Sequence, residues 1–199
     1  MPDPPVLGPD DVDVLLWYAV AAVRSGLERR PVPDIKVPAS AALNALGATF
    51  VTLERGGRLL GCIGTLEAVR PLYEDVMANA YKSAFADPRV PSVTSEDYIA
   101  MDVKVSVLSP TEPIAASTRD QLVAELEPGR DGVLLVGDGF RATFLPSVWP
   151  RMASAADFVE LLLRKGGLDD GWLPGMRAFR YAASEYCQSG PRRPIHRPG

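Results

Sequence analysis

A cysteine that stands between two glycines is the residue of this sequence best suited to chemistry. The run is Gly61-Cys62-Ile63-Gly64-Thr65. Glycine removes side-chain cover and permits unusual backbone angles, so the Cys62 sulfur and nearby N–H groups could line a concavity that holds an anion. Cys62 is therefore a candidate nucleophile, and Gly61, Gly64 and Thr65 are candidate substrate-binding residues.

A reactive thiol needs a nearby cation, because the thiolate is the species that attacks. Arg89, Lys104 and Arg141 are the candidate cations, and only folding could bring them to Cys62. Arg89 stands shortly after Asp87, and such a pair could present a carboxylate and a guanidinium at the mouth of a pocket. All four charged residues are therefore candidate site residues.

A further polar residue follows Lys104 at the spacing of a strand. Val103, Val105 and Val107 alternate with polar residues, so Lys104 and Ser106 would share one face and could point into the site of Cys62. Ser106 is thus a further candidate for substrate binding.

Each candidate also has an ordinary structural role open to it. Free cysteine is among the most buried residue types, and a strand rich in glycine can serve close packing around Cys62. Asp87 could end a helix with Arg89 in solvent. Lys104 and Ser106 could form the wet face of a sheet. The sequence leaves both interpretations open.

The charge and the apolar pattern exclude several partner classes. The 199 residues carry 25 acidic and 21 basic side chains, well mixed, with a net charge of −4, so no basic stripe offers itself to nucleic acid. The longest apolar run, residues 14–23, is about half of what a bilayer span needs. We therefore expect neither nucleic acid nor a membrane as a partner.

Cysteine and histidine usage indicates the compartment and argues against a metal. Cys62 and Cys187 lie far apart, which is not a disulfide framework, so both are predicted to be free thiols in a reducing, cytoplasmic compartment. The single histidine, His196, lies in a Pro/Arg-rich tail, and no Cys/His cluster has zinc spacing. We expect no metal and no cofactor.

The elements that must position these residues follow an α+β order. An amphipathic helix is predicted to end at Gly26, and a hairpin turns at the Gly56-Gly57 pair. A helix follows Pro71 and stops before residue 87, and residues 101–109 form a half-exposed strand.

The second half of the sequence repeats this order. A hairpin over 133–145 precedes a helix that begins at Ser154, and residues 177–183 form a matching strand. Hairpin, helix and strand thus occur twice, which predicts an internal duplication. The predicted organisation is an N-terminal tail over 1–10, one compact domain over 11–188 with repeated units at roughly 48–109 and 131–186, and a disordered tail over 189–199.

Six segments in a fixed order resemble one known family. They are Gly61-Cys62-Ile63-Gly64-Thr65, Ala86-Asp87-Pro88-Arg89, Val105-Ser106-Val107-Leu108, Gly129-Arg130-Asp131-Gly132-Val133, Arg141-Ala142-Thr143-Phe144-Leu145-Pro146 and Leu163-Arg164-Lys165-Gly166-Gly167. The family is that of the AMME syndrome candidate gene, whose prokaryotic members are called AmmeMemoRadiSam system protein A. Leu60, Val90, Ser92 and Ser147 stand where the family usually has other residues.

The resemblance implies an α+β AMMECR-like domain, and it implies no settled reaction. Prokaryotic members of the family resemble partners of a Memo-like protein and a radical-SAM protein. Our first hypothesis is a cytoplasmic component of such a system that binds or processes a small anionic substrate at a pocket centred on Cys62. The alternative is a non-catalytic protein-interaction module, and a third is a housekeeping cysteine enzyme without these partners.

Overall fold

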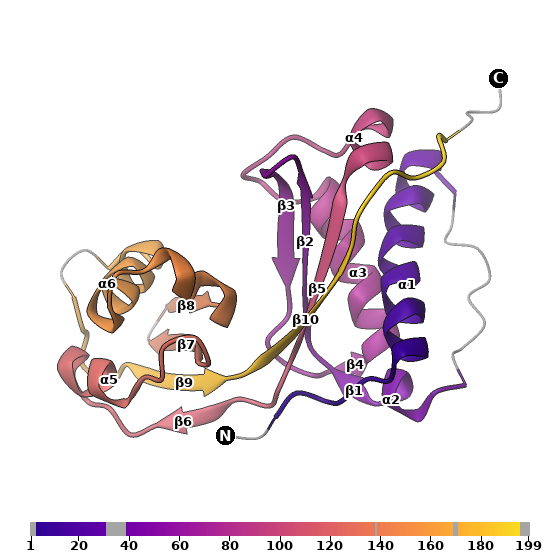
Figure 1. Ribbon diagram of the computed structural model, residues 1–199. Coiled ribbons are helices and arrows are strands. Elements are labelled where there is room, and N and C mark those ends of the chain that lie inside the picture. Colours follow the sequence, from indigo (N-terminus) through magenta and orange to yellow (C-terminus); the bar gives the residue numbers. More distant parts are fainter. Residues whose placement is uncertain (1–2, 31–38, 138, 169–170, 196–199) are drawn as a thin grey trace. The chain divides into compact units, whose positions relative to one another are not determined.

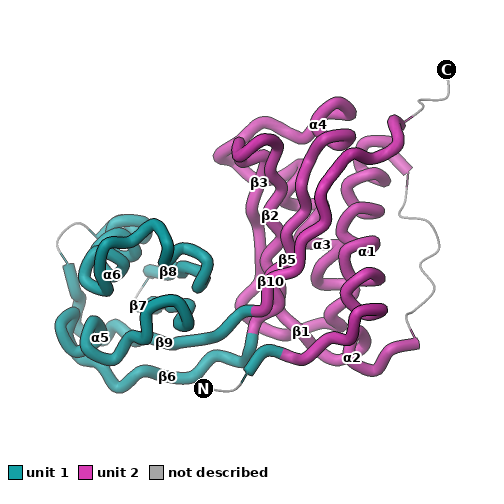
Figure 2. Tube along the Cα trace, in the orientation of Figure 1, with its two compact units in different colours: residues 1–4, 109–183 teal, residues 5–108, 184–199 magenta. Residues whose placement is uncertain are grey.

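The computed structural model describes residues 3–30, 39–137, 139–168 and 171–195 (Figure 1). These residues divide into two units, coloured separately in Figure 2. Unit 1 contains the described residues of 1–4 and 109–183, and unit 2 those of 5–108 and 184–199. Each unit has a sheet and a hydrophobic core of its own.

Unit 2 is a four-stranded sheet with helices on one face (Figure 1). The strand order is β10-β5-β2-β3, which leaves β3 at an edge. The elements are α1 (Pro9–Glu28), α2 (Ala41–Asn44), β1 (Leu46–Gly47), β2 (Thr49–Arg55), β3 (Arg58–Gly64), β4 (Arg70–Pro71), α3 (Leu72–Phe85), α4 (Ser95–Ala100), β5 (Asp102–Leu108) and β10 (Ala183–Gln188).

The core of unit 2 lies between the sheet and helices α1 and α3. Alternate residues of β5 are fully buried, and so is one stripe of α3 that includes Val76 and Ala80. This is the pattern of a half-buried strand against an amphipathic helix, as predicted from the sequence. The predicted hairpin is confirmed: Arg55 pairs with Arg58, and Gly56 and Gly57 have φ of 55° and 79°, which glycine adopts at little cost.

Unit 1 is a second antiparallel sheet, of order β6-β9-β7-β8. Its elements are β6 (Glu112–Ile114), α5 (Arg119–Glu125), β7 (Gly132–Gly137), β8 (Phe140–Phe144), the short 3-10 helix η1 (Pro146–Arg151), α6 (Ala155–Lys165) and β9 (Arg177–Tyr181). The helix predicted to start at Ser154 is confirmed, because the Ser154 side chain accepts the Asp157 N–H as N-cap.

The unit boundaries differ from those predicted at 48–109 and 131–186. Helix α1 packs on the sheet of unit 2, and β6 pairs with β9 in unit 1. The predicted units contained neither of these two elements. The strand predicted at 177–183 is found as β9 in the sheet of unit 1, and β10, which begins at Ala183, is a further strand beside β5 in the sheet of unit 2. The duplication itself stays a prediction.

The two ends of the chain are more engaged than the predicted tails suggest. Helix α1 begins at Pro9 with Gly8 as N-cap. Within the predicted disordered tail, the Arg192 N–H donates to Ile99 O at 2.8 Å, and its guanidinium donates to Met101 O. Residues 196–199 lie outside the described residues. None of the helices in the described part of the chain is long and apolar enough to cross a membrane.

Candidate functional site

Three side chains form a row across the outer face of the unit 2 sheet. Cys62 on β3 lies opposite Thr52 on β2, and Thr52 lies opposite Lys104 on β5. Residues directly opposite each other on antiparallel strands share one face. The Thr52 hydroxyl donates to the Cys62 sulfur at 3.2 Å, and Cys62 is half-buried. Cys62 and Lys104 thus lie on one face of the sheet, and their part in a common site stays a prediction.

The backbone of Cys62 faces away from β2. The N–H groups that point toward β2 are those of residues 63 and 65. The Thr65 N–H donates to Thr49 O at 2.9 Å, and the Ile63 N–H points in the same direction. Cys62 and Thr52 therefore form a non-hydrogen-bonded pair, whose own N–H and C=O groups point out of the hairpin. At the edge of a sheet, these groups need another partner.

Asp87 and Arg89 supply that partner. The Cys62 N–H donates to Asp87 Oδ2 at 2.8 Å, and Arg89 Nη2 donates to Cys62 O at 2.7 Å. The two side chains also bind each other, through Nε to Oδ1 at 2.9 Å and Nη2 to Oδ2 at 2.7 Å. We call this pair the edge clamp, because it occupies the place that a further strand would take beside Cys62.

Burial and charge make the clamp asymmetric. The Asp87 side chain is 1% exposed and that of Arg89 is 53% exposed. Hydrogen bonding from the Arg89 guanidinium lowers the pKa of Asp87 well below its usual range, against the opposing effect of burial, and the N–H groups of Cys62 and Arg89 lower it further. The bond to Asp87 likewise raises the pKa of Arg89. The clamp is an ion pair at neutral pH.

The Asp87→Asn variant should lose about 2 kcal/mol of unfolding free energy at pH 7, because a buried charged acceptor is replaced by a neutral amide. A carboxyl whose pKa is lowered by folding stabilises the native state fully above its ordinary pKa of about 4 and progressively less below it. Urea unfolding from pH 7 to pH 2.5 should therefore show the difference from wild type shrinking below about pH 4.

The exposed Asp120 of α5 supplies a matched control for that experiment. Asp120→Asn should differ little from wild type at any pH in the series, because surface substitutions of this kind stay within about 0.5 kcal/mol. A difference for Asp87→Asn that does not change with pH would contradict an ionised clamp.

Both glycines of the run have a packing role. A Cβ placed on Gly61 would lie 1.8 Å from the backbone oxygen of Ser83 on α3, and one on Gly64 would lie 2.2 Å from the Phe50 ring. Gly61 therefore lets helix α3 approach the sheet, and Gly64 accommodates an aromatic ring from the neighbouring strand. Their part in substrate binding stays a prediction.

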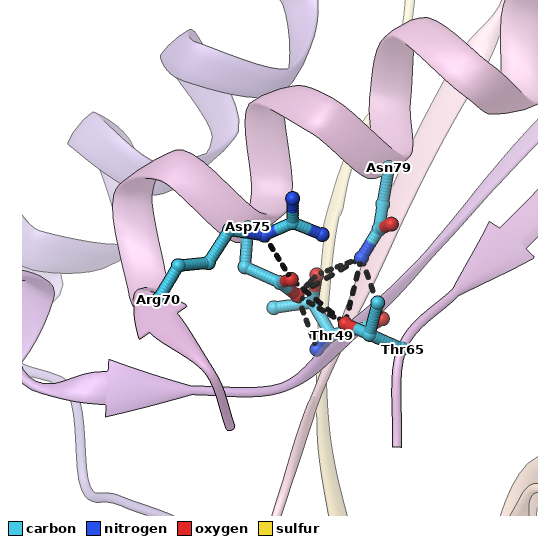
Figure 3. A network of polar contacts seen from close by, with 5 residues as sticks. All are labelled: Thr49, Thr65, Arg70, Asp75 and Asn79. Atoms are coloured by element: carbon cyan, nitrogen blue, oxygen red, sulfur yellow. Dashed lines mark hydrogen bonds and ion pairs between the residues drawn. The ribbon is translucent and has the colours of Figure 1, made fainter. Parts of the chain in front are cut away.

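Thr65 joins a buried polar network that the sequence analysis missed (Figure 3). Asp75, which is fully buried, accepts from the Thr65 hydroxyl at 2.7 Å, from the N–H and hydroxyl of Thr49 at 2.8 and 2.7 Å, and from Arg70 Nε at 2.8 Å. Asn79 Nδ2 donates to Asp75 Oδ2 at 2.9 Å and to Thr49 O at 3.0 Å. Helix α3 is thereby fixed to both strands of the hairpin.

Ser83 continues this row one turn further along α3. Its hydroxyl donates to Val51 O at 2.7 Å and accepts the Ile63 N–H at 2.9 Å, so it stands between two strands that would otherwise bond directly. Asp75, Asn79 and Ser83 recur every four residues, which places them on one helix face. That spacing, continued at Asp87, is the signal by which the sequence could have revealed the network.

The other predicted site residues have partners elsewhere. Lys104 forms an ion pair with Glu54 at 2.9 Å, which raises the pKa of Lys104. Ser106 is only 4% exposed and lies opposite Phe50. Arg141 belongs to β8 in unit 1, whereas Cys62 belongs to unit 2, and a part for Arg141 in substrate binding stays a prediction.

A family model described as AMMECR1 matches residues 16–186, which is most of the chain. This chain belongs to the AMMECR1 family. The resemblance predicted from the segments around Cys62, Asp87 and Arg141 is thereby confirmed.

Relatives in the AMMECR1 family agree in length as well as in sequence. A protein of Methanothermobacter thermautotrophicus is 35% identical over 144 residues, covering 71% of this chain and 75% of its own. Protein MJ0810 of Methanocaldococcus jannaschii is 33% identical over 180 residues, covering 88% and 89%. The crystal structure of the uncharacterized protein PH0010 from Pyrococcus horikoshii matches with a TM-score of 0.82 at 29% identity, covering 92% and 94%. The α+β fold is thus confirmed.

The charged side chains near residues 61–65 are paired, which leaves little unpaired charge for chemistry at Cys62. Arg89 and Lys104 are each paired with a carboxylate, and the Cys62 sulfur accepts a hydrogen bond from a hydroxyl. The described residues contain no group of three or more histidine, cysteine, aspartate or glutamate side chains that could hold a metal ion. His196 lies outside the described residues. The arrangement is suited to holding β3 in place.

Proposed function

We propose that this chain is a non-catalytic protein-interaction subunit, a cytoplasmic component of an AmmeMemoRadiSam-type system that binds a Memo-like protein beside a radical-SAM protein. The partners come from the family resemblance. The choice of binding over catalysis is supported by the site, where the edge clamp of Asp87 and Arg89 consumes the polar groups around Cys62. No general base is bonded to the sulfur among the described residues.

The observation that carries the proposal is a groove lined by helix α1 and by Tyr98 of α4. It measures about 260 Å³ and is lined by Trp17, Val20, Ala21, Arg24, Ser25, Glu28 and Tyr98. Trp17 is 53% exposed, and Val14, one turn earlier on the same helix, is 37% exposed. Exposed tryptophan next to arginine is the composition that marks the anchor of a protein interface.

Charge around the groove supports a protein partner rather than a small anion. Arg24 is bonded to Glu28 at 2.8 Å, so the polar rim is neutral overall. Trp17 packs edge-on against Tyr18 with ring centroids 5.3 Å apart, and Tyr18 is buried in the core. The indole is therefore held in place before binding, which lowers the entropy cost of using it as an anchor.

The test is calorimetric titration of the purified chain with a Memo-like protein encoded in the same genome. Trp17→Ala should weaken binding by at least about tenfold, as expected for an interface anchor. Tyr81→Ala, which removes another half-exposed aromatic ring from α3, is the matched control and should bind like wild type. Cys62→Ser should also bind like wild type. Equal binding by Trp17→Ala and wild type would overturn the proposed surface.

A second candidate function is binding of a small anion at Cys62. It is favoured by one observation, that the half-exposed guanidinium of Arg89 lies beside the backbone of a half-buried thiol. The same calorimeter tests it with inorganic phosphate as the titrant. Saturable heat that is lost in Arg89→Ala would support this candidate, and no heat would contradict it.

A further inference from the structure

Unit 1 contains a hollow that no function proposed above uses. It measures about 580 Å³ and lies where the segment before β7, helix η1 and the start of α6 meet. Its walls include Pro128, Pro146, Trp149, Pro150, Met152 and Ser154. Pockets for small molecules commonly measure about 300–1,000 Å³ and are lined mainly by apolar and aromatic side chains. The size and lining are those of a small-molecule site.

The walls are held in place by contacts outside the hollow. The indole of Trp149 stacks on Phe158 with ring centroids 4.0 Å apart and an interplanar angle of 12°. Its Nε1 donates to Asp131 O at 2.7 Å, and the Asp131 N–H in turn donates to Glu127 O at 3.1 Å. Phe158 and Asp131 are fully buried, so these contacts fix the Trp149 indole to the core of unit 1. A preformed site of this kind loses little entropy when a ligand enters.

Charge selects the kind of ligand. None of the described residues that line the hollow carries a charge. The start of α6 would favour an anion, but the Asp157 carboxylate already lies in its first turn and accepts from the Ser154 hydroxyl at 2.8 Å. That hydroxyl also accepts the Asp157 N–H at 3.1 Å. The start of α6 thus already has a carboxylate of its own, and the described lining offers an anionic ligand no cation.

We propose that this hollow binds a small, uncharged molecule with an apolar, aromatic body. Such a body packs against the rings of Pro128, Pro146 and Pro150 and the thioether of Met152, since proline rings and sulfur are apolar surfaces and sulfur contacts aromatic rings favourably. The site lies within unit 1 and is independent of the groove on α1.

The test uses N-phenyl-1-naphthylamine, a neutral probe whose fluorescence rises in apolar sites, titrated into the full chain. Wild type should show a saturable rise, and the sulfonated relative 1-anilinonaphthalene-8-sulfonate should bind at least about tenfold more weakly, because its charge would be desolvated against a lining without a cation. No saturable rise, or tighter binding of the sulfonate, would overturn the proposal.

A variant that fills the hollow tests whether the probe binds there. Ala153 is exposed and lines it, so Ala153→Phe adds a ring to the space without a clash in the core. It should weaken the neutral probe at least about tenfold, since the added ring takes the apolar surface that the probe would bury. Ala115→Phe, at an exposed position outside the lining, is the control and should bind like wild type.

Sedimentation of the chain at the same concentrations tests whether a second copy of the chain covers the hollow instead of a small molecule. If wild type self-associates and Ala153→Phe is monomeric, the hollow is covered by another copy of the chain and the small-molecule proposal is overturned. Unchanged sedimentation together with lost probe binding in Ala153→Phe supports it. Equal probe binding by Ala153→Phe and Ala115→Phe also overturns it.

Discussion

Asp75→Ala is expected to destabilise the protein by about 3–5 kcal/mol, the range for removing one partner of a buried charged network. Asp75 is fully buried and accepts from Thr49, Thr65, Arg70 and Asn79. Its removal would leave the Thr49 N–H without its acceptor inside the protein, and Arg70, 28% exposed, without its ion-pair partner. The unfolding free energy from urea titration, followed by circular dichroism, measures the loss.

The control for this variant is Glu74→Ala, which removes an exposed carboxylate from the same turn of α3. Its effect should stay within about 0.5 kcal/mol, as for most surface substitutions. Asp75→Asn keeps the shape of the side chain and should fall between the two. A loss below 1 kcal/mol for Asp75→Ala would show that the network contributes little to stability.

Gly61→Ala has the second-largest expected effect, at about 3 kcal/mol or more, the upper end of what overpacking costs. The new Cβ would lie 1.8 Å from the Ser83 backbone oxygen, and 2.7 Å from the carbonyl carbon. A backbone atom of a helix cannot rotate away as a side chain can. Helix α3 would have to move off the hairpin, which would also weaken the bonds that Ser83 makes between β2 and β3.

Gly64→Ala is the matched comparison on the same strand. Its Cβ would meet the Phe50 ring, whose Cγ lies 2.2 Å away, and a side chain can shift to another rotamer. We expect a smaller loss than for Gly61→Ala when both are measured by thermal unfolding. Equal losses would contradict the view that the approach of α3 is what requires glycine at position 61.

Much of the fold follows from local sequence patterns, and less of the site does. The hairpin at Gly56-Gly57 and the alternating strand at Lys104 could be predicted, because turn-forming residues and a period-two alternation of apolar residues are visible within a few neighbouring positions. Strand β6 was missed because it is three residues long and contains Pro113. Propensity carries little information over so short a segment.

The sequence predicted which residues belong to the site better than it predicted what those residues contact. Asp87 and Arg89 were expected to act as a pair, and they do bind each other, but their shared partner is the backbone of Cys62 rather than a pocket. A side chain that binds a distant strand edge leaves no local pattern. Asp75 was missed for a related reason: a polar residue in an amphipathic helix is expected to face solvent, and here it faces threonine hydroxyls on the sheet.

The path of the chain between β5 and β10 has a consequence for how the protein is assembled. These strands are neighbours in the sheet of unit 2, yet residues 109–182, which make up nearly all of unit 1, lie between them in the sequence. At the base of unit 1 the Ser109 N–H donates to Ala182 O at 2.9 Å, and the Ala182 N–H donates to the Ser109 hydroxyl at 2.9 Å. These two hydrogen bonds join the start and the end of the inserted segment. Strand β10 therefore follows a short closed junction and not a long flexible loop. Because β9 ends at Tyr181 and β10 begins at Ala183, the last strand of the unit 1 sheet leads directly into the last strand of the unit 2 sheet, and both sheets are completed by one short stretch of the chain.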